Sequence, residues 1–364
     1  MDTPTRFAER FNKDMGMVSF TSSINETIAP LCSVCIANYN GERFIEKCIE
    51  SILKQENVTG AVEIIVHDDA SKDDSVALIR SRYPEILLLE SKENLGFCIS
   101  NNRMVAMAKG KFILLLNNDA TLHADALRTL YEASVAHGDG IYGLPQYDAS
   151  TGELIDIGSV FDPFLNPIPN KNLDRTDVGM IIGACLFLPK HLWETLGGFP
   201  EWFGSLSEDL YLCSYARLRG FPVKAIATSG FYHWVGQSFG GGRILSNKKL
   251  STKLSRRSLS ERNKTFVMLI CYPSLLVYLL IPLHLVLLIF EGLLLTVIKQ
   301  DKRVWLQIYW FCLREVWKKR MLWVEQRRVV QHDRRCSTSL FLSTFTFFPH
   351  KMRMLFIYGM PNLR

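Results

Sequence analysis

The chain has 364 residues, 48% of them hydrophobic and 21% charged, which is enough for one large α/β domain and an appendage. Its formal net charge is +6, and the last third is rich in Lys and Arg beside apolar sequence. This pattern favours an anionic membrane surface as a partner, and the lack of zinc-ligand pairs or a recognition-helix signature argues against nucleic acid.

The nine cysteines show no secreted disulfide framework. Cys32 and Cys35 form a C-x-x-C in a strand-like run without a second pair of ligands, so they do not indicate zinc. The first residues are polar and charged, with no apolar stretch of the signal-peptide kind. We therefore expect a mobile arm over residues 1–30 and a domain that stays in the reducing cytoplasm.

From residue 31, short apolar runs alternate with longer ones whose apolar residues recur at helical spacing. The expected strands cover residues 32–39, 62–71, 86–90 and 111–120. The expected helices cover residues 43–54, 73–82, 99–108 and 124–137. Because apolar strands alternate with helices, we predict an α/β fold with a mostly parallel sheet and helices on both of its faces.

Residues 139–178 are rich in Gly, Pro, Asn and Asp, which predicts loops with short strands. The elements expected after them are a strand over 181–189, a helix over 190–196, a helix from the acidic SLSED to Arg219, and a strand over 222–228. We place one domain at 31–245 and a basic, helical C-terminal region at 246–364.

Polar clusters follow three of the predicted strands, where ligands bind in parallel sheets. They are Asn38-Tyr39-Asn40, Asp68-Asp69 and Asn117-Asn118-Asp119. Turn chemistry or helix capping is a sufficient explanation for one such cluster. Three clusters in successive units indicate a ligand site.

Asp119 follows a strongly apolar strand and is the candidate metal ligand. A carboxylate there suits Mg²⁺ or Mn²⁺, which take one or two carboxylates and complete their coordination with phosphate and water. Asn117 can hydrogen-bond but adds no negative charge. The alternative, Asp119 as the N-cap of the following helix, remains open at this point.

Further candidates lie near the same edge of the predicted sheet. Asp69 is placed to accept a hydrogen bond from a pyrimidine N–H, with Asp68 pointing away to cap a turn. The segment Asn94-Leu95-Gly96, followed by Asn102, adds a glycine and amides. Alone, that segment is a weak signal.

Glu208 and Asp209 begin an amphipathic helix and are the candidate catalytic acids. One of them can act as a general base that removes a proton from a hydroxyl nucleophile. Capping of the helix N-terminus is the competing explanation. His233 either binds a metal or contacts a diphosphate, or it packs without a chemical role.

Together these residues resemble the family 2 glycosyltransferases of the GT-A fold, and most of all the membrane-associated rhamnosyltransferase-like branch that builds bacterial surface polysaccharides. The matching stretches come in the order of the family and cover about residues 32–240. They are CSVCIANYNGERFIEKCIESIL, VEIIVHDDASKDDSV, ENLGFCISNNRMVAMAKGKFILLLNNDA, GACLFLPKHLWETLGGFPEWF, SEDLYLCSYARLRGF and FYHWVGQS.

The resemblance implies an inverting, metal-dependent transfer of one sugar from a nucleotide-diphosphate sugar, with dTDP-rhamnose the first expectation and a UDP-hexose the second. By this resemblance, Asp69 reads the nucleobase, and Asn38 and Tyr39 line the nucleotide pocket. Asp119 holds the metal, His233 lies near the diphosphate, and Asp209, beside Glu208, is the general base. The other residues expected in the donor site are Asn94, Gly96, Asn102, Asn117 and Asn118.

Three features depart from the family pattern. Asn117 stands at the first position of the D-x-D motif, which leaves Asp119 as the main anionic ligand. Tyr211 replaces the second acid that often follows the base. The Q-x-x-R-W of processive synthases is not found in the sequence, which favours one sugar per encounter over polymer extrusion.

The run 266–298 is nearly all apolar and long enough to cross a bilayer, but both of its flanks are basic. We therefore prefer a re-entrant or interfacial hairpin bent at Pro273 and Pro282, followed by a Trp-rich interfacial helix. Such an anchor would hold the active site at the cytoplasmic face of the membrane, against a lipid-linked saccharide acceptor of the undecaprenyl-diphosphate kind. Exposed surface in this region is also compatible with self-association.

Two other functions are weighed against sugar transfer. A catalytically silent membrane scaffold that binds nucleotide sugars or partner enzymes is disfavoured because both Asp119 and Asp209 are present. A nucleotide-dependent oxidoreductase is disfavoured because no G-x-G-x-x-G follows the first predicted strand.

Overall fold

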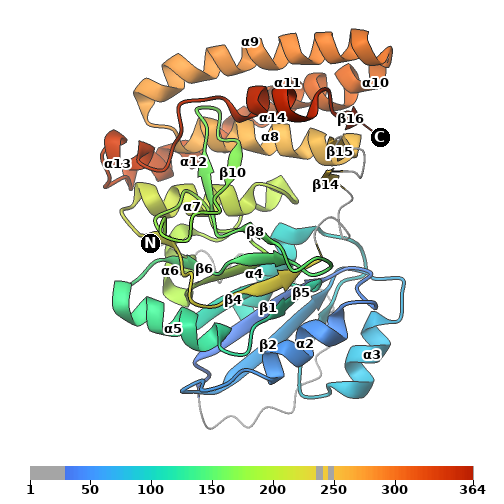
Figure 1. Cartoon of the computed structure of the whole chain (residues 1–364), viewed down its shortest axis with the longest axis vertical. Helices are drawn as coiled ribbons and strands as arrows, with labels where there is room; N and C mark the ends of the chain where they lie inside the picture. The colour runs from blue at the N-terminus through green and yellow to red at the C-terminus, as the bar shows by residue number, and fades with distance from the viewer. Residues whose placement is uncertain (1–28, 235–240, 245–249, 364) are drawn as a thin grey trace. The chain divides into compact units, whose positions relative to one another are not determined.

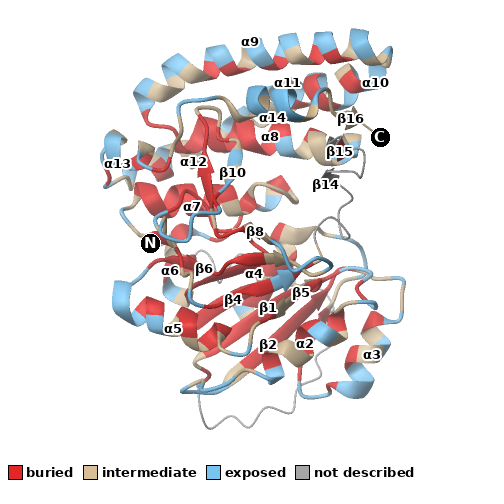
Figure 2. Ribbon diagram, in the orientation of Figure 1, coloured by how far each residue is buried: buried red, intermediate tan, exposed pale blue. Residues whose placement is uncertain are grey.

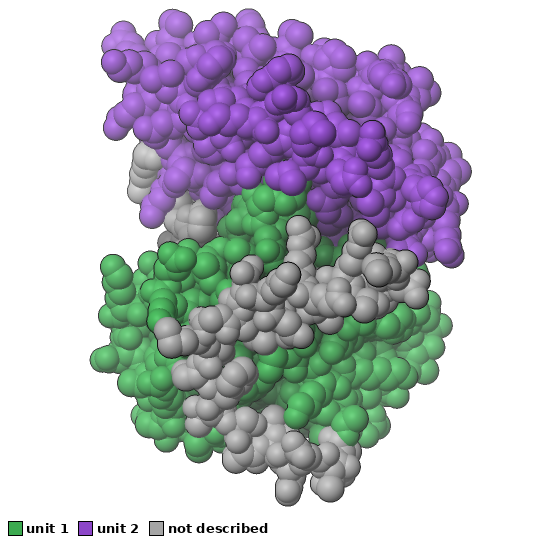
Figure 3. All heavy atoms as spheres, turned by 180° about the vertical axis from the view of Figure 1, so that it is seen from behind, with its two compact units in different colours: residues 1–158, 170–205, 221–234 green, residues 159–169, 206–220, 235–364 purple. Residues whose placement is uncertain are grey.

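The computed structural model describes residues 29–234, 241–244 and 250–363. The chain divides into two compact units (Figure 3). Unit 1 comprises Met1–Gly158, Asn170–Ser205 and Phe221–Trp234, and unit 2 comprises Ser159–Pro169, Leu206–Gly220 and Val235–Arg364. Most of the arm expected at 1–30 therefore lies outside the described residues. The domain limits expected from the sequence stay a prediction.

Unit 1 is built on a seven-stranded sheet with the strand order β12-β6-β11-β4-β1-β2-β3 (Figure 1). Its strands are β1 (Cys32–Asn38), β2 (Val62–Asp68), β3 (Leu87–Glu90), β4 (Phe112–Asn117), β6 (Ile141–Gly143), β11 (Cys185–Pro189) and β12 (Val223–Ala225). Only β11 runs antiparallel to its neighbours in this sheet. The predicted α/β fold with a mostly parallel sheet is confirmed.

Helices surround this sheet. They are α2 (Ile45–Leu53), α3 (Ser75–Arg82), α4 (Phe97–Met107), α5 (Ala126–His137) and α6 (Lys190–Leu196), with a short 3₁₀ turn η1 (Glu201–Phe203). Alternate strand residues such as Val34, Val66 and Leu114 share one core cluster with Ile49 of α2. Their neighbours of opposite parity are buried too, and α4 contacts β1 and β2. Successive side chains of a strand point to opposite faces, so both faces of the sheet are covered.

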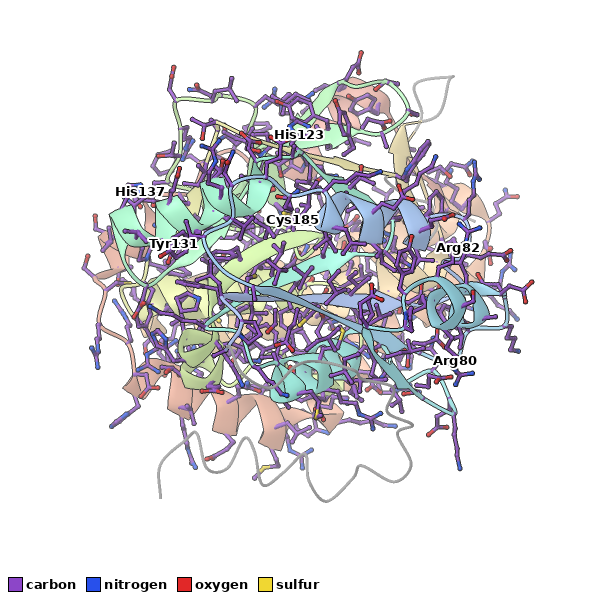
Figure 4. All side chains as sticks on the ribbon, turned by 90° about the horizontal axis from the view of Figure 1, so that it is seen from below. Arg80, Arg82, His123, Tyr131, His137 and Cys185 are labelled. Atoms are coloured by element: carbon purple, nitrogen blue, oxygen red, sulfur yellow. The ribbon has the colours of Figure 1, made fainter. Side chains whose placement is uncertain are left out.

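Burial accounts for most of the stability of this unit. The strands of the central sheet are buried along their length (Figure 2). Each fully buried Val, Leu or Ile side chain contributes about 1.5–3 kcal/mol relative to exposure. Cys185 of β11 lies among packed side chains, whereas Arg80 and Arg82 lie at the periphery on α3 (Figure 4).

A second, smaller sheet of unit 1 has the order β5-β13-β7-β8. Its strands are β5 (Ala120–Leu122), β13 (Phe231–His233), β7 (Gln146–Asp148) and β8 (Leu154–Asp156). β5 follows β4 after a two-residue turn and pairs antiparallel with β13, so that His233 lies opposite Ala120. This sheet brings residues far apart in the chain to the end of β4.

Unit 2 is mainly helical. Its helices are α7 (Glu208–Leu218), α8 (Leu254–Cys271), α9 (Ser274–Lys299), α10 (Lys302–Val304), the π-helix η2 (Trp305–Trp310), α11 (Phe311–Lys318), α12 (Arg320–His332), α13 (Thr338–Leu342) and α14 (His350–Tyr358). Its strands are β9 (Ser159–Phe161), β10 (Pro167–Pro169), β14 (Gly241–Ile244), β15 (Leu250–Thr252) and β16 (Asn362–Leu363).

The apolar run 266–298 belongs to two helices. Its first residues form the buried C-terminal end of α8, whose carbonyls at Leu269 and Tyr272 accept hydrogen bonds from Arg327 at 2.8 and 2.7 Å. Pro273 then separates α8 from α9, as expected. Pro282, the second proline at which we expect a bend, lies inside α9, and the helix continues through it. A proline removes one backbone hydrogen bond, and the packing of the helix outweighs that loss.

Candidate active site

The three polar clusters meet at the carboxyl edge of the main sheet. The strand register places Asn38 opposite Asp68 and Ala37 opposite Asn117. Asn118 Nδ2 donates to Asn38 Oδ1 at 2.8 Å, and Asn38 Nδ2 donates to Asp68 Oδ1 at 2.8 Å. One buried chain of hydrogen bonds therefore links the ends of β4, β1 and β2.

This chain of hydrogen bonds extends into the loops that follow the strands. Asn38 also bonds Ser75 at 3.0 Å, and Asp68 accepts from the Ser71 hydroxyl at 2.6 Å. A Cβ at Gly41 would collide with the amides of Asn38 and Asn118, so only glycine fits there. Tyr39, beside this network, leaves its ring exposed and available to a ligand.

Asp69 organises the loop before α4. Its two carboxylate oxygens accept hydrogen bonds from the backbone N–H of Leu95 at 2.7 Å and of Gly96 at 2.9 Å. Burial raises the pKa of this carboxyl, and the two N–H groups counteract the rise. Gly96 has φ +91°, and a Cβ there would lie 3.0 Å from the Gly204 carbonyl oxygen. That Asp69 reads the nucleobase stays a prediction. In that role its carboxylate oxygens would accept the nucleobase N–H with the lone pairs that the two backbone N–H groups leave free.

Two further residues expected in the donor site, Asn94 and Asn102, differ in their burial and contacts. Asn94 is exposed. Asn102 is buried, and its amide bonds the backbone of Phe199 through both ends, at 2.9 Å from Nδ2 to the carbonyl and 3.0 Å from the N–H to Oδ1. Asn102 therefore joins α4 to the turn after α6. Its predicted contact with a donor is not tested by this arrangement.

Asp119 and His233 form a buried pair at the junction of the two sheets. Their Oδ1 and Nε2 atoms lie 3.0 Å apart. Asn117 Nδ2 lies 3.4 Å from the same Nε2 atom. At the other ring nitrogen, Nδ1, Gln146 Nε2 lies 2.9 Å away. The alternative of Asp119 as a helix N-cap is wrong, because α5 begins after Asp125.

The donor set of this pair fits a hard divalent cation. Two neighbouring ligands, each about 2.1 Å from an octahedral cation, lie about 3.0 Å apart; Asp119 and His233, joined here by a hydrogen bond of 3.0 Å, have this separation. No cluster of three or more His, Cys, Asp or Glu side chains able to hold a metal occurs in the described part of the chain. The protein would therefore provide part of a coordination sphere that phosphate and water complete.

Gln146 is a residue of this centre that sequence reasoning missed. It is buried in β7, within the stretch expected to form loops with short strands, and no motif marks it. A hydrogen-bond partner on the second nitrogen of a metal-binding His fixes the tautomer and the ring orientation. The pairing of β7 with β13 is the structural reason why Gln146 reaches His233.

Glu208 and Asp209 belong to unit 2, where they form the first turn of α7. The two residues before them, Leu206 and Ser207, have positive φ angles of 71° and 65°. Such angles are strained for residues with a Cβ, and strain of this kind concentrates at functional sites. Asn263 of α8 holds this turn by donating to the Leu206 carbonyl at 2.7 Å.

The two carboxyl groups of this turn differ in their electrostatics. Burial, and then the neighbouring Asp209, raise the pKa of Glu208 to about 8. The positive charge of Arg256 on α8 opposes this rise. Burial lowers the pKa of Arg256 itself, and the charges of Glu208 and Asp209 offset only part of that lowering. Glu208 therefore holds a proton at neutral pH. A carboxyl group that already holds a proton cannot accept another, so Asp209 is the better candidate for the base.

Tyr211, which stands where the family often has a second acid, is a buried structural residue. Its hydroxyl accepts a hydrogen bond from Gln326 of α12 at 2.8 Å. Burial raises its pKa well above the ordinary value, so it stays neutral. Tyr211 joins α7 to α12 and supplies no charge to the turn that holds Asp209.

Glu208→Gln is expected to remove a pH dependence from the stability of the protein. The unfolded chain loses the Glu208 proton near pH 4.5, whereas the folded chain keeps it up to about pH 8. Wild type therefore loses stability as the pH rises between these values, by up to about 1.4 kcal/mol per pH unit, and the variant does not. Thermal unfolding of both proteins from pH 5 to pH 9 measures this difference.

The matched control is Glu325→Gln, which changes an exposed carboxyl of unit 2. The difference in stability between Glu325→Gln and wild type should not vary with pH. A constant difference between Glu208→Gln and wild type across the same range would contradict the raised pKa.

Comparisons with known proteins agree with this geometry. Residues 33–196 match the family model "Glycosyl transferase family 2". The succinoglycan biosynthesis protein ExoO of Rhizobium meliloti is 36% identical over 110 residues, which are 30% of this chain and 31% of that protein. The poly(ribitol-phosphate) beta-glucosyltransferase of Bacillus spizizenii is 26% identical over 211 residues, 56% of this chain and 32% of that protein. The matches thus span about a third of the length of these curated relatives.

Solved structures resemble this chain in fold. The mannosyltransferase PcManGT from Pyrobaculum calidifontis, in complex with GDP-Man and Mn²⁺, has a TM-score of 0.50 at 16% identity and covers 91% of this chain and 94% of its own. GalNAc-T7 with UDP, GalNAc and Mn²⁺ has a TM-score of 0.53 at 13% identity, covering 68% of this chain and 48% of its own. With its mostly parallel sheet and the match at 33–196, the chain carries over these residues a family 2 glycosyltransferase domain of the GT-A fold.

Proposed function

We propose that this protein transfers one sugar, with inversion, from a nucleotide-diphosphate sugar to a lipid-linked saccharide at the cytoplasmic face of a membrane, in the synthesis of a surface polysaccharide. The observation that carries the proposal is the buried Asp119–His233 pair, 3.0 Å apart at the carboxyl edge of the sheet of a family 2 domain. Ligands of parallel α/β sheets bind at this edge.

The donor would lie over the ends of β1, β2 and β4. Asn38, Asn118 and Asp68 hold the loops there in place through buried hydrogen bonds, which supports a preformed nucleotide site. Asp69 and the N–H groups it binds keep the loop at Gly96 close to β2. dTDP-rhamnose and a UDP-hexose are the two donors we propose, and the glucosyltransferase relative supports a hexose.

Asp119, His233 and the Asn117 amide would hold a divalent cation. When Mg²⁺ or Mn²⁺ is bound there, it supplies positive charge beside the diphosphate leaving group. The single carboxylate of this set leaves coordination positions for phosphate oxygens. Gln146 would keep the His233 ring in its orientation, and binding of the cation by Nε2 would require the Gln146 amide to turn so that its oxygen accepts the proton of Nδ1.

Asp209 would act as the general base. As the acceptor hydroxyl oxygen forms its bond to the anomeric carbon, its proton passes to Asp209, and the bond from that carbon to the diphosphate oxygen breaks. Attack opposite the leaving group inverts the configuration at this carbon. Glu208 already holds a proton and cannot accept the one from the acceptor, which supports Asp209 in this role.

The acceptor is proposed from chemistry and surroundings. Relatives named for succinoglycan biosynthesis and for poly(ribitol-phosphate) glucosylation support a polysaccharide product. The apolar helix α9, with 26 residues, is long and apolar enough to cross a membrane and supports attachment to one. An undecaprenyl-diphosphate saccharide would be available at that surface.

A panel of nucleotide sugars with and without Mn²⁺ tests this function. We expect one donor to raise the melting temperature only when Mn²⁺ is present, and the same donor to pass labelled sugar to a lipid extract. Stabilisation without any transfer or slow hydrolysis would instead support a protein that binds nucleotide sugars without catalysis. No response to any donor would contradict the proposal.

A further inference from the structure

Large exposed apolar side chains concentrate in unit 2. Of those in the described part of the chain, twelve lie on α9 alone. They are Leu275, Tyr278, Leu279, Leu283, Val286, Leu287, Ile289, Phe290, Leu293, Leu294, Val297 and Ile298. At 100° per residue they spread over more than half of the helix circumference. These residues form one continuous apolar surface, whereas the exposed apolar residues of an ordinary soluble protein are scattered singly.

His284 and Glu291 of α9 face the protein. The buried stripe runs from Ile281 through His284 and Leu288 to Leu295. His284 Nε2 lies 2.9 Å from Thr265 Oγ1 of α8. Glu291, the single acid of the helix, pairs with Arg257 of α8 and lies 2.8 Å from Lys351 of α14. This arrangement is the reverse of a helix that faces water, and it indicates an apolar surrounding.

The surface continues beyond α9. Lys351 links α14 to α8 and α9 through Glu261 and Glu291, at 2.5 and 2.8 Å. From α14 and the segment before it, Phe347, Phe348, Met352 and Phe356 expose their side chains. We call the exposed apolar residues of α9 and α14, with Phe347 and Phe348, the apolar face; Figures 1 and 2 show α9 and its exposed residues.

The charge of the surrounding sequence identifies the occupant of this face. Residues 250–363 contain eighteen Lys and Arg but only six Asp and Glu. Lys302, Arg303, Lys318 and Arg320 are exposed on the helices that follow α9, and Trp317 is exposed beside them. Basic and Trp side chains around an apolar surface suit the anionic headgroups of a bilayer.

We propose that α9 lies in the plane of an anionic bilayer, with the apolar face immersed in one leaflet, and does not cross it. Gly292 allows close packing of α9 on η2, because a Cβ there would meet the rings of Tyr309 and Trp305 at 2.5 and 2.9 Å. The buried stripe also contacts α8. A crossing orientation would carry α8, with Arg257, Glu261 and Lys264, into the hydrocarbon.

Those charges are held in a network that fits the protein interior. Glu261 lies 2.9 Å from Lys264 and 2.5 Å from Lys351. Charged side chains at the centre of a bilayer are costly, even when paired. With α9 in the plane of the leaflet, these groups stay on the protein side of the helix, behind its apolar face. The in-plane orientation therefore satisfies both the apolar and the charged residues.

The first experiment measures binding of the full chain to vesicles. We expect strong co-sedimentation with phosphatidylcholine vesicles that contain phosphatidylglycerol, and weaker binding without it or at high salt. Val286→Glu with Phe290→Glu should weaken binding by about tenfold or more, because both side chains are 62% exposed on the apolar face. The matched control is Val135→Glu on α5 of unit 1, also exposed, which should leave binding unchanged.

The second experiment separates the in-plane from the crossing orientation. All nine native cysteines are buried, so a cysteine introduced on the surface can be labelled selectively. We place single cysteines at Leu275, Phe290 and Ile298 and measure the depth of a fluorescent label by quenching from brominated lipids. The in-plane orientation predicts similar, shallow depths for all three. Crossing predicts a deep label at Phe290, with the two ends accessible from opposite sides, and would overturn the proposal.

The proposal concerns unit 2 alone, so its tests are independent of sugar transfer. Circular dichroism and a cooperative thermal unfolding transition like that of wild type should persist in Val286→Glu with Phe290→Glu, which shows that the variant is folded. If the full chain instead forms a dimer that this variant dissociates, without binding vesicles, a second copy of the chain covers the face and the bilayer is excluded.

Discussion

Asp209→Asn is expected to lower the rate of sugar transfer by about 10²- to 10⁴-fold, which is the usual contribution of a general base. The amide has the shape of the carboxyl group but cannot take the acceptor proton. Binding of the nucleotide sugar should be unchanged within about twofold, because the role of Asp209 begins only as the acceptor attacks. Single-turnover transfer of labelled sugar, with donor binding measured by calorimetry, checks both parts.

Glu208→Gln is the matched control for this variant. Glu208 is neutral at pH 7 according to its raised pKa of about 8, and glutamine keeps its size and lack of charge. Most of the transfer rate should therefore survive. The opposite result, with Glu208→Gln inactive and Asp209→Asn active, would assign the base to Glu208. Equal activity of both variants would remove this turn from the mechanism.

Asp119→Asn is expected to weaken Mn²⁺-dependent donor binding by about 100-fold, since a full negative charge is lost from the cation position. The substitution keeps the shape of the side chain, and its amide can still contact His233. Calorimetric titration of the nucleotide diphosphate at several Mn²⁺ concentrations measures the effect without requiring catalysis. Binding in the absence of metal should be little changed.

Two further variants sharpen this test. Asn117→Asp adds a second carboxylate beside Asp119 and should tighten Mn²⁺-dependent binding. Asp139→Asn removes an exposed carboxyl group that pairs with His191 on the surface, and it should have no effect. Donor binding that responds to Mn²⁺ equally in wild type and Asp119→Asn would contradict the metal role of Asp119.

The main sheet was predictable because its signals are local. The apolar runs that became β1, β2 and β4 are continuous, and their neighbours have helical spacing, so strand and helix alternate visibly in the sequence. Parallel pairing then aligns the strand ends, and Asn38 lies opposite Asp68 as this logic requires. Element limits differ from the expected ones by a few residues.

Short strands were expected within 139–178, but the pairing of the smaller sheet could not be predicted, because each of its strands has only three residues. Strands this short show no periodicity, and pairing of β13 with β5 joins residues more than a hundred positions apart. This pairing brings His233 to Asp119 and Gln146 to His233. The N-cap alternative for Asp119 was undecided for the same reason, since it depends on where α5 begins.

Two donor-site candidates illustrate how tertiary contacts assign side chains. Asn102 shares a polar stretch with Asn94, but it is buried and bonds the Phe199 backbone at both ends of its amide. Asp69 uses both oxygens to hold the loop at Gly96. No pattern in a single sequence distinguishes an amide that binds a ligand from one that joins two loops.

By itself the sequence determined the α/β class, the strand ends that carry the acids, and the apolar character of α9, because these properties depend on residues close together in the chain. Only the tertiary structure decided which atoms meet at Asp119, whether Glu208 keeps its proton at neutral pH, and which side of α9 is buried. Those properties depend on distances and burial, and both are created when segments remote in the chain pack together.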